Sequence, residues 1–210
     1  MESTFKPFLI KGLNQMSISY SDTQLTQLCH FLVLLTEWNK AINLTAITLP
    51  HEMVSKHILD SLSLLPYIED SPILDVGTGA GLPGIPLSIM CPDKKFVLLD
   101  KLNKRMQFLH HVIFNLNLNN VTLRCERVES LTDFEFPCII SRAFANVSKL
   151  VSVSGQCLSD QGKILAMTGL VEQEMLDNLP KDWLALKPKK LDVPGIDKPH
   201  FVVIVEKRKQ

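Results

Sequence analysis

Apolar residues recur every three or four positions early in the chain. Within residues 22–39 the leucines at this spacing share one helical face: Leu25, Leu28, Leu32 and Leu35. The spacing predicts an amphipathic helix. A second helix is predicted at about residues 51–65, because Pro50 suits a helix start and Pro66 cannot continue one. No strand pattern precedes these helices, so residues 1–70 are predicted to form a helical N-terminal extension.

After residue 70 short apolar runs alternate with helical patterns. Strands are predicted at 73–76, 95–100, 121–125, 138–140, 163–167, 183–191 and 200–206. Helices are predicted at 84–91, 103–118, 145–158 and 170–179. This alternation predicts an α/β domain over residues 71–210, with a doubly wound, mainly parallel, seven-stranded sheet of the Rossmann-like kind. No helix separates the last two strands, so they are expected to pair antiparallel.

The amino-acid composition makes some classes of protein less favoured but does not identify the function. Hydrophobic residues make up 46% of the chain, enough for a core, and 22 basic residues balance 22 acidic ones. The zero net charge argues mildly against a nucleic-acid binder, although residues 71–210 carry a net charge of +3. The five cysteines form no C-x-x-C pair, so we expect neither a metal site nor disulfides, and we expect a reducing cytoplasm. No apolar run predicts a membrane span.

The most informative segment is the glycine-rich run that follows the first predicted strand. Asp75, Gly77, Gly79 and Gly81 fit the pattern D-x-G-x-G-x-G, whereas Gly79, Gly81 and Gly84 fit the dinucleotide pattern G-x-G-x-x-G. In an open α/β sheet, ligands bind at the carboxyl ends of the strands. The run therefore predicts a nucleoside-containing ligand at this point, against the alternative of a glycine turn that binds nothing.

The acids near this run favour one ligand over the other. S-adenosylmethionine carries a sulfonium and an ammonium group but no phosphate, so Asp75 would attract its ammonium and would repel a pyrophosphate. Asp100 ends the second strand and can accept hydrogen bonds from two ribose hydroxyls in either ligand. Val128 and Glu129 follow the third strand, where a backbone group and a carboxylate can meet an adenine edge. We therefore predict an S-adenosylmethionine-dependent methyltransferase, with an NAD(P)-dependent oxidoreductase as the alternative.

Several motifs together resemble one known family. The first is the glycine run with its continuation Leu82-Pro83-Gly84-Ile85-Pro86-Leu87. The others, in order, are Trp38-Asn39-Lys40 with Asn43-Leu44-Thr45, His57-Ile58-Leu59-Asp60-Ser61, Arg127-Val128-Glu129 and Ser141-Arg142-Ala143-Phe144. From about residue 25 onward the chain is similar to the GidB/RsmG family, the bacterial small-subunit ribosomal RNA methyltransferase G.

The resemblance implies a fold, a reaction and a set of contacts. It implies a class I methyltransferase fold and methyl transfer to N7 of a guanosine in the 530 loop of 16S ribosomal RNA. It also implies cofactor contacts at matching positions: Gly77, Leu82, Val128, Glu129 and Arg142. The partner would be 16S ribosomal RNA or the small ribosomal subunit. Apart from the resemblance, we expect the protein to be a monomer. Thr168 stands where the family commonly has lysine, so any role of that lysine does not carry over.

The chemistry of N7 explains why no acid or base is nominated. N7 exposes an in-plane lone pair and loses no proton on methylation, so proximity and a suitable electrostatic field suffice. We therefore nominate no catalytic residue. A non-catalytic RNA-binding module on the same fold remains an alternative.

Some motif residues have two interpretations. Arg142 could bind the cofactor, a phosphate or guanine O6, or form a structural salt bridge. His57 and Asp60 should share a helical face and either link the extension to the sheet or contact RNA. Phe144 could stack on a base or lie in the core, and Asn39 could contact RNA or hold a turn.

Overall fold

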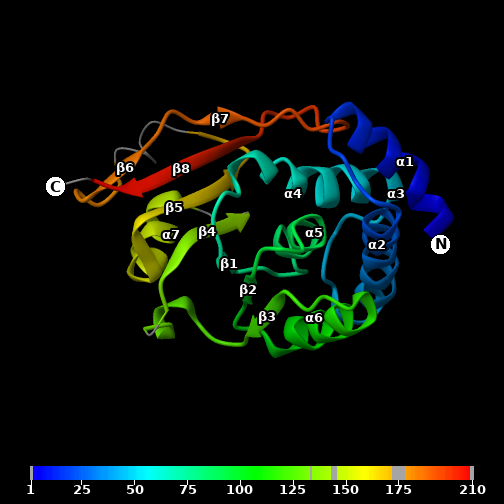
Figure 1. Ribbon diagram of the computed structural model, residues 1–210, viewed down its shortest axis with the longest axis horizontal. Helices are drawn as coiled ribbons and strands as arrows, with labels where there is room; N and C mark the ends of the chain where they lie inside the picture. The colour runs from blue at the N-terminus through cyan, green and yellow to red at the C-terminus, as the bar shows by residue number, and fades with distance from the viewer. Residues whose placement is uncertain (1, 133, 143–145, 172–177, 209–210) are drawn as a thin grey trace.

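A computed structural model describes residues 2–132, 134–142, 146–171 and 178–208. A central sheet carries helices on both faces, and the N-terminal helices stand at one end of the molecule (Figure 1). The strands are β1 (Ile73–Val76), β2 (Phe96–Leu99), β3 (Val121–Arg124), β4 (Phe136–Arg142), β5 (Leu158–Thr168), β6 (Trp183–Ala185), β7 (Lys189–Lys190) and β8 (Phe201–Lys207). The α-helices are α1 (Glu2–Gln15), α2 (Asp22–Ile42), α3 (Pro50–Met53), α4 (Asp60–Leu62), α5 (Gly84–Met90), α6 (Asn103–Leu116) and α7 (Val147–Ser154). The other helical segments are the π-helix η1 (Val54–Leu59) and the 3₁₀ turns η2 (Leu65–Tyr67), η3 (Val128–Ser130) and η4 (Gly155–Cys157).

The strand order is β3-β2-β1-β4-β5-β8-β6, with β7 paired to β8. Strands β1 to β5 are parallel, and β8 pairs antiparallel with β5, β6 and β7. The chain therefore moves outward from β1 to β3 and returns to β4 on the other side of β1. This reversal confirms the predicted doubly wound, mainly parallel sheet, and it places a topological switch point between β1 and β4.

The predicted number of strands was wrong by one. The single strand expected at residues 183–191 is two short strands, β6 and β7, so the described residues form eight strands. Leu186 still donates its backbone N–H to Ile204 of β8. Pro188 has no N–H to continue the ladder, and the strand breaks there.

Side chains alternate between two hydrophobic cores across the sheet. Ile73 of β1 packs with the N-terminal helices, α5 and α6, whereas Leu74 and Val76 pack with α7 on the opposite face. Such two-sided burial is expected of parallel strands whose crossover helices cover both faces. It leaves the ends of the strands as the part of the sheet where a ligand can approach the backbone.

The N-terminal helices share a core with the sheet. Helix α2 begins with a capping box, in which Ser21 and Gln24 each accept the other's backbone N–H. Helix α1, which the sequence analysis did not predict, packs closely enough on η1 that Gly12 faces the side chain of Leu59 without room for a methyl group. The division into residues 1–70 and 71–210 stays a prediction. No described helix is both long and apolar enough to cross a membrane.

The predicted helix at residues 51–65 is present but is not regular. It comprises α3, the π-helix η1, α4 and the turn η2 in succession. π-Helical turns are rare and frequently lie at functional sites. Here η1 and α4 carry His57 and Asp60. Two other predicted helices are only partly described: residue 145 of 145–158 and residues 172–177 of 170–179 lie outside the described residues.

Candidate functional site

The glycine-rich loop joins β1 to α5 at the carboxyl edge of the sheet. Gly77, Gly79 and Gly81 all have positive φ, of 72°, 59° and 82°, a region that side chains with a Cβ rarely adopt. A Cβ on Gly77 would meet no atom within 4 Å. The loop therefore presents bare backbone with open space beside it.

Asp75 supports this loop from inside the protein. Its side chain is fully buried, and its Oδ2 accepts hydrogen bonds from the Thr78 hydroxyl (2.6 Å) and the Gly84 backbone N–H (2.9 Å). The other oxygen, Oδ1, is buried without a hydrogen-bond partner among the described residues. Burial raises the pKa of Asp75 to about 6, although the two hydrogen bonds act against this rise. An ionisable oxygen with no partner is a feature that a bound cation would satisfy.

Asp100 follows β2 and faces the same loop. Its carboxylate accepts hydrogen bonds from the backbone N–H of Gly79 (3.1 Å) and of Leu102 (2.9 Å), and from Arg105 (2.8 Å). The side chain is buried. It thus ties the glycine loop to the start of α6 while standing at the strand end where a ribose would lie.

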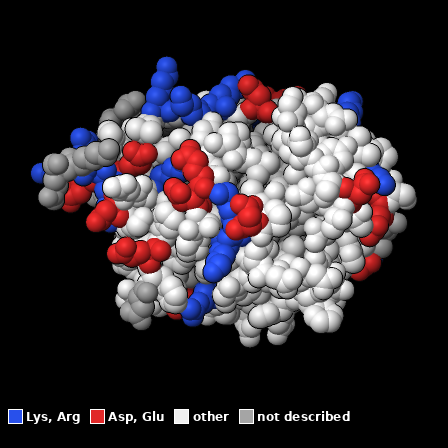
Figure 2. Space-filling model, viewed as in Figure 1, with Lys and Arg blue, Asp and Glu red and all other residues white. Residues whose placement is uncertain are grey.

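A hollow of about 310 Å³ opens between the ends of β1, β2 and β3. Four of the eight predicted cofactor residues line it: Gly77, Asp100, Val128 and Glu129. Its charged lining is mixed, with Lys101, Arg105, Arg127 and Lys149 beside Asp100, Glu126 and Glu129. Basic and acidic side chains are also interspersed over the face seen in Figure 2, where a band of basic residues is flanked by acids.

The other four predicted residues do not line this hollow. Asp75 and Gly79 hold the loop that forms one wall of it. Leu82 is buried in the core beneath α5. Arg142 ends β4 and turns toward the N-terminal helices, as shown below.

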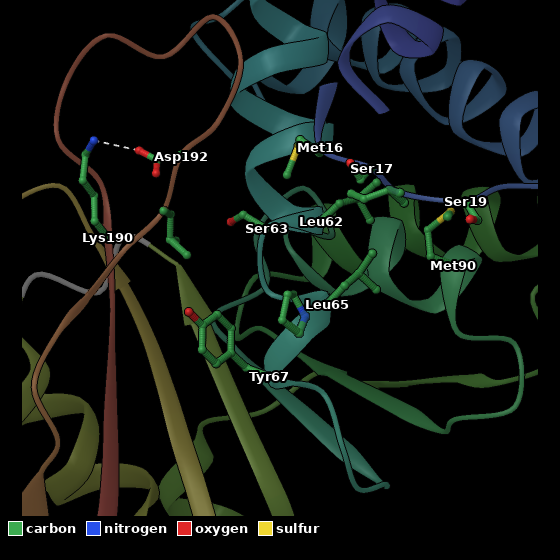
Figure 3. Close-up of a pocket in the computed structure, with 13 residues that line it drawn as sticks. Met16, Ser17, Ser19, Leu62, Ser63, Leu65, Tyr67, Met90, Lys190 and Asp192 are labelled. Carbon is green, nitrogen blue, oxygen red and sulfur yellow. Dashed lines mark ion pairs between the residues drawn. The ribbon is translucent and has the colours of Figure 1, made fainter. Parts of the chain in front are cut away.

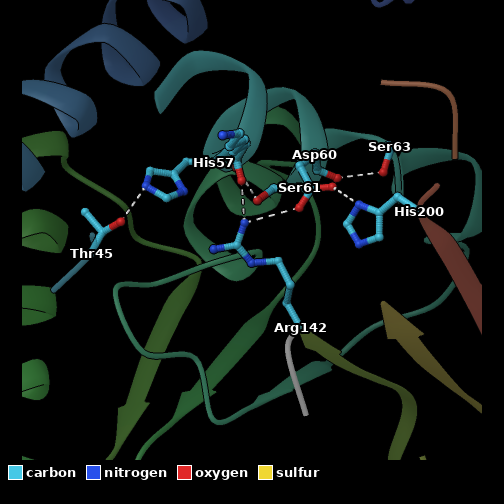
Figure 4. A network of polar contacts seen from close by, with 8 residues as sticks. Thr45, His57, Asp60, Ser61, Ser63, Arg142 and His200 are labelled. Carbon is cyan, nitrogen blue, oxygen red and sulfur yellow. Dashed lines mark hydrogen bonds and ion pairs between the residues drawn. The ribbon is translucent and has the colours of Figure 1, made fainter. Parts of the chain in front are cut away.

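Arg142 joins the sheet to the helix that carries Asp60. Its Nη1 donates to the Lys56 carbonyl (2.6 Å) and lies 3.2 Å from Asp60 Oδ2 (Figure 4). The other oxygen of Asp60 lies 2.6 Å from Nδ1 of His200, which directly precedes β8. Asp60 is almost fully buried, so these three side chains together link η1, β4 and β8. Among the roles considered for Arg142, the structure shows the structural salt bridge.

His57 points away from this trio, so the expectation that it shares a face with Asp60 was wrong (Figure 4). The wider turn of η1 rotates the two side chains apart. His57 Nε2 lies 3.0 Å from the Thr45 hydroxyl. Burial, together with the nearby positive charge of Arg142, lowers the pKa of His57 to about 4.

The side chain of Asn39 joins the motif Trp38-Asn39-Lys40 to the motif Asn43-Leu44-Thr45. Its side chain donates to the Thr45 carbonyl (2.9 Å) and accepts from the Thr45 backbone N–H (2.8 Å). Asn39 therefore holds the turn that brings Thr45 to His57. Of its two interpretations, an RNA contact or a turn, the structure shows the turn.

Sequence reasoning did not identify His200, because nothing near it in the chain marks it as functional. It lies 140 positions after Asp60, and only the sheet brings the two together. Phe144, which was considered as a stacking residue, lies outside the described residues. Thr168 ends β5, where its hydroxyl donates to the Leu170 carbonyl (2.8 Å) and closes a turn.

A second cavity, of about 600 Å³, lies between the turn after α1, the α4–η2 segment and β7 (Figure 3). Its lining includes Met16, Leu62, Tyr67 and the exposed ion pair between Lys190 and Asp192. None of the predicted cofactor residues lines it. We therefore place the candidate site at the glycine loop.

A family model described as GidB, rRNA small subunit methyltransferase G, matches residues 24–203. The chain belongs to this family. A relative from Idiomarina loihiensis, named ribosomal RNA small subunit methyltransferase G, is 41% identical over 95% of this chain and 98% of its own. One from Aeromonas salmonicida with the same name is 45% identical over 88% of this chain and 89% of its own.

Solved structures support the fold independently of sequence. The crystal structure of ribosomal protein L11 methylase from Lactobacillus delbrueckii subsp. bulgaricus superposes with a TM-score of 0.53 at 14% identity. The match covers 72% of this chain and 77% of that one. At this identity the likeness shows the fold, and it confirms the predicted methyltransferase architecture. Family membership makes this protein a methyltransferase and does not favour the oxidoreductase or the non-catalytic module.

Proposed function

We propose that the protein transfers a methyl group from S-adenosylmethionine to N7 of a guanosine in the 530 loop of 16S ribosomal RNA. The observation that carries this proposal is the hollow beside Gly77 at the carboxyl ends of β1, β2 and β3, in a chain that belongs to the rRNA small subunit methyltransferase G family. The nucleotide and its loop come from the family resemblance. The substrate is small-subunit RNA or the subunit that contains it, the protein acts as a monomer, and the reaction takes place in the cytoplasm.

The residues around the hollow fit the donor. Gly77 leaves open space for an adenosine moiety, and Asp100 is a buried carboxylate able to accept from ribose hydroxyls. Val128 and Glu129 stand on the opposite wall, where they can meet the adenine. The unpartnered Oδ1 of Asp75 offers a negative charge to the ammonium group, directly or through water.

The other predicted cofactor residues would support the donor site: Gly79, Leu82 and Arg142. Gly79 donates its backbone N–H to Asp100 and so orients that carboxylate. Leu82 packs under the loop and keeps its shape. Arg142 stands at the end of β4, beside β1, where its positive charge can stabilise a carboxylate of the donor.

The chain has to position two substrates rather than move a proton. When bound, S-adenosylmethionine supplies an electrophilic methyl carbon on a sulfonium. Guanine N7 already presents an in-plane lone pair and loses no proton, so no side chain has to act as a general base. The catalytic contribution expected from the protein is alignment and a field that tolerates charge moving to the base.

Methyl transfer to isolated small subunits tests the proposal. Subunits from cells that lack this activity are incubated with the protein and S-adenosylmethionine, and N7-methylguanosine is located by borohydride and aniline cleavage. We expect one new cleavage, in the 530 loop. Methylation at another atom or loop would refute the proposed target, and transfer to no RNA at all would refute the proposed activity.

A further inference from the structure

A second opening at the same edge of the sheet is not used by the donor residues. This cleft, of about 650 Å³, is bounded by Lys56 and Asp60, by Gly169 after β5, and by the segment 195–200. Its size is within the range of cavities that hold small ligands. We refer to it as the η1–β8 cleft.

The η1–β8 cleft lies on the far side of Arg142 from the donor hollow. Strand β4 separates β1 from β5, and neighbouring strands are about 4.8 Å apart. The ends of β1 and β5 are thus about 10 Å apart, two strand spacings. The base itself has to bridge this distance, because its N7 must come to about 3 to 3.5 Å from the methyl carbon. A purine whose far edge is hydrogen-bonded in the cleft extends toward β1 and can present N7 there.

The wall of the cleft is fixed by packing and not only by loop conformation. Gly195 has a φ of 79° and leaves no room for a Cβ against Ser55 of η1. The His200 carbonyl accepts the backbone N–H of Leu191 (2.7 Å). His200 is therefore held in place by its own backbone as well as by Asp60.

The pairing with Asp60 determines the free nitrogen of the His200 ring. Asp60 Oδ1 lies only 2.6 Å from Nδ1, although the N–H direction does not meet the geometry of a regular hydrogen bond and leaves Oδ1 without one. Two such atoms approach this closely only with a proton between them, which places the hydrogen on Nδ1. In the neutral ring Nε2 is then a hydrogen-bond acceptor. Nε2 has no protein partner among the described residues, and His200 lines the cleft. A rigidly oriented hydrogen-bond acceptor with no protein partner is suited to accept a hydrogen bond from a ligand.

We propose that the η1–β8 cleft receives the target guanine and that His200 Nε2 accepts a hydrogen bond from its Watson–Crick edge. This inference rests on the proposed function. Guanine presents N1–H and a 2-amino group on that edge, whereas adenine presents an acceptor at N1. Binding this edge leaves N7, on the opposite side of the base, free to attack. Asp60 acts through His200 as a positioning residue.

The test combines protein variants with altered bases. Small subunits are reconstituted with guanosine, inosine or 2-aminopurine riboside at the target position; inosine lacks the 2-amino group and 2-aminopurine lacks N1–H. The proteins compared are the wild type, His200→Ala, His200→Gln and the control His110→Ala, which removes an exposed histidine on α6. For each pair kcat/KM is measured, and binding of S-adenosylhomocysteine is measured by calorimetry.

We expect the wild type to prefer guanosine over at least one analogue by roughly three- to tenfold, the worth of one hydrogen bond. In His200→Ala this preference should fall to about one, because the acceptor is gone, while affinity for S-adenosylhomocysteine is unchanged. His200→Gln places an amide oxygen near the position of Nε2 and should recover part of the preference. His110→Ala should behave as the wild type. Dividing the two preferences cancels the intrinsic reactivity of N7 in each base.

Two outcomes overturn the proposal in different ways. If the wild type methylates guanosine subunits and His200→Ala keeps the same preference over both analogues, the inference about His200 is wrong and the proposed function stands. If the wild type methylates none of the subunits, the proposed function fails and this inference fails with it. A purely structural role of His200 would lower the melting temperature and the rates on all three bases equally, which also contradicts the proposal.

Discussion

Replacing Asp75 by asparagine is expected to stabilise the ligand-free protein and to weaken donor binding. Burial raises the pKa of Asp75 from its ordinary 3.8 to about 6. At about 1.4 kcal/mol per pKa unit, the ionised carboxylate costs the folded state about 3 kcal/mol at neutral pH. Asparagine removes this cost and can still accept the two hydrogen bonds now made to Oδ2. Its amide N–H₂ would take the place of Oδ1 and stay unpaired, which costs about 1 to 2 kcal/mol. The expected net gain is about 1 to 2 kcal/mol.

The free energy of unfolding should also depend on pH in a way that Asp75→Asn changes. The pKa of Asp75 is higher in the folded than in the unfolded chain, so between pH 4 and pH 6 the folded state binds the proton more strongly. Stability from this group therefore decreases as pH rises through that window and is constant above it. Asparagine does not titrate, so the advantage of Asp75→Asn should be present at pH 7 and absent at pH 4.

Urea unfolding followed by tryptophan fluorescence gives the free energy of unfolding of both proteins, at pH 7 and at pH 4, without ligand. Calorimetry with S-adenosylmethionine measures the loss of affinity. A variant less stable than the wild type at pH 7, or one whose difference from the wild type is the same at both pH values, would show that the Asp75 carboxylate does not destabilise the folded protein as proposed. Unchanged affinity for S-adenosylmethionine would remove Asp75 from the proposed donor contacts.

Three further predictions concern other buried or tightly packed positions. Because the pKa of His57 is lowered to about 4, its stabilising contribution is complete above pH 6.5 and is lost toward pH 4, by about 3 kcal/mol. His57→Gln should therefore lose less stability than the wild type between pH 6 and pH 4 in urea unfolding; an equal loss in the two proteins would contradict this. Gly77→Val should bind S-adenosylhomocysteine at least about tenfold more weakly by calorimetry and lose about 1 to 2 kcal/mol of stability, because valine must adopt a positive φ and its side chain enters the hollow. Gly12→Ala should lose up to about 2 kcal/mol in urea unfolding, because overpacking against the buried Leu59 side chain costs about 1 to 3 kcal/mol and the helix preference of alanine over glycine offsets about 1 kcal/mol of it. An unchanged donor affinity is expected because the hollow is remote from α1.

The parts of the fold that sequence reasoning identified depend on local patterns. The glycine loop was predicted correctly because its positive φ values require glycine at three positions close together in the chain. Strands β1, β2 and β4 were predicted because they are short, largely buried apolar runs, and the edge strand β3 was predicted from its apolar pattern although it is only partly buried. Helix α1 was missed, although Phe5, Leu9 and Leu13 are buried at a four-residue spacing that is typical of a helix.

The parts that were not predicted depend on distant contacts. The π-helix η1 has the same apolar period as an α-helix over so few residues, so the divergence of His57 from Asp60 could not be inferred. The broken strand after residue 185 is the exception, because its cause is local: Pro188 has no N–H for the ladder to β8. The ion pair between Arg142 and Asp60 and the contact of His200 with the same carboxylate exist only because β4 and β8 bring these residues to η1.

A crystal structure with S-adenosylhomocysteine would show whether the hollow at the glycine loop is the donor site. We expect the adenosine moiety in the hollow beside Gly77, with its ribose at Asp100 and its amino group toward Asp75, and the η1–β8 cleft left free for the base. Density for the ligand in the η1–β8 cleft, or a hollow that stays empty at saturating ligand, would contradict this.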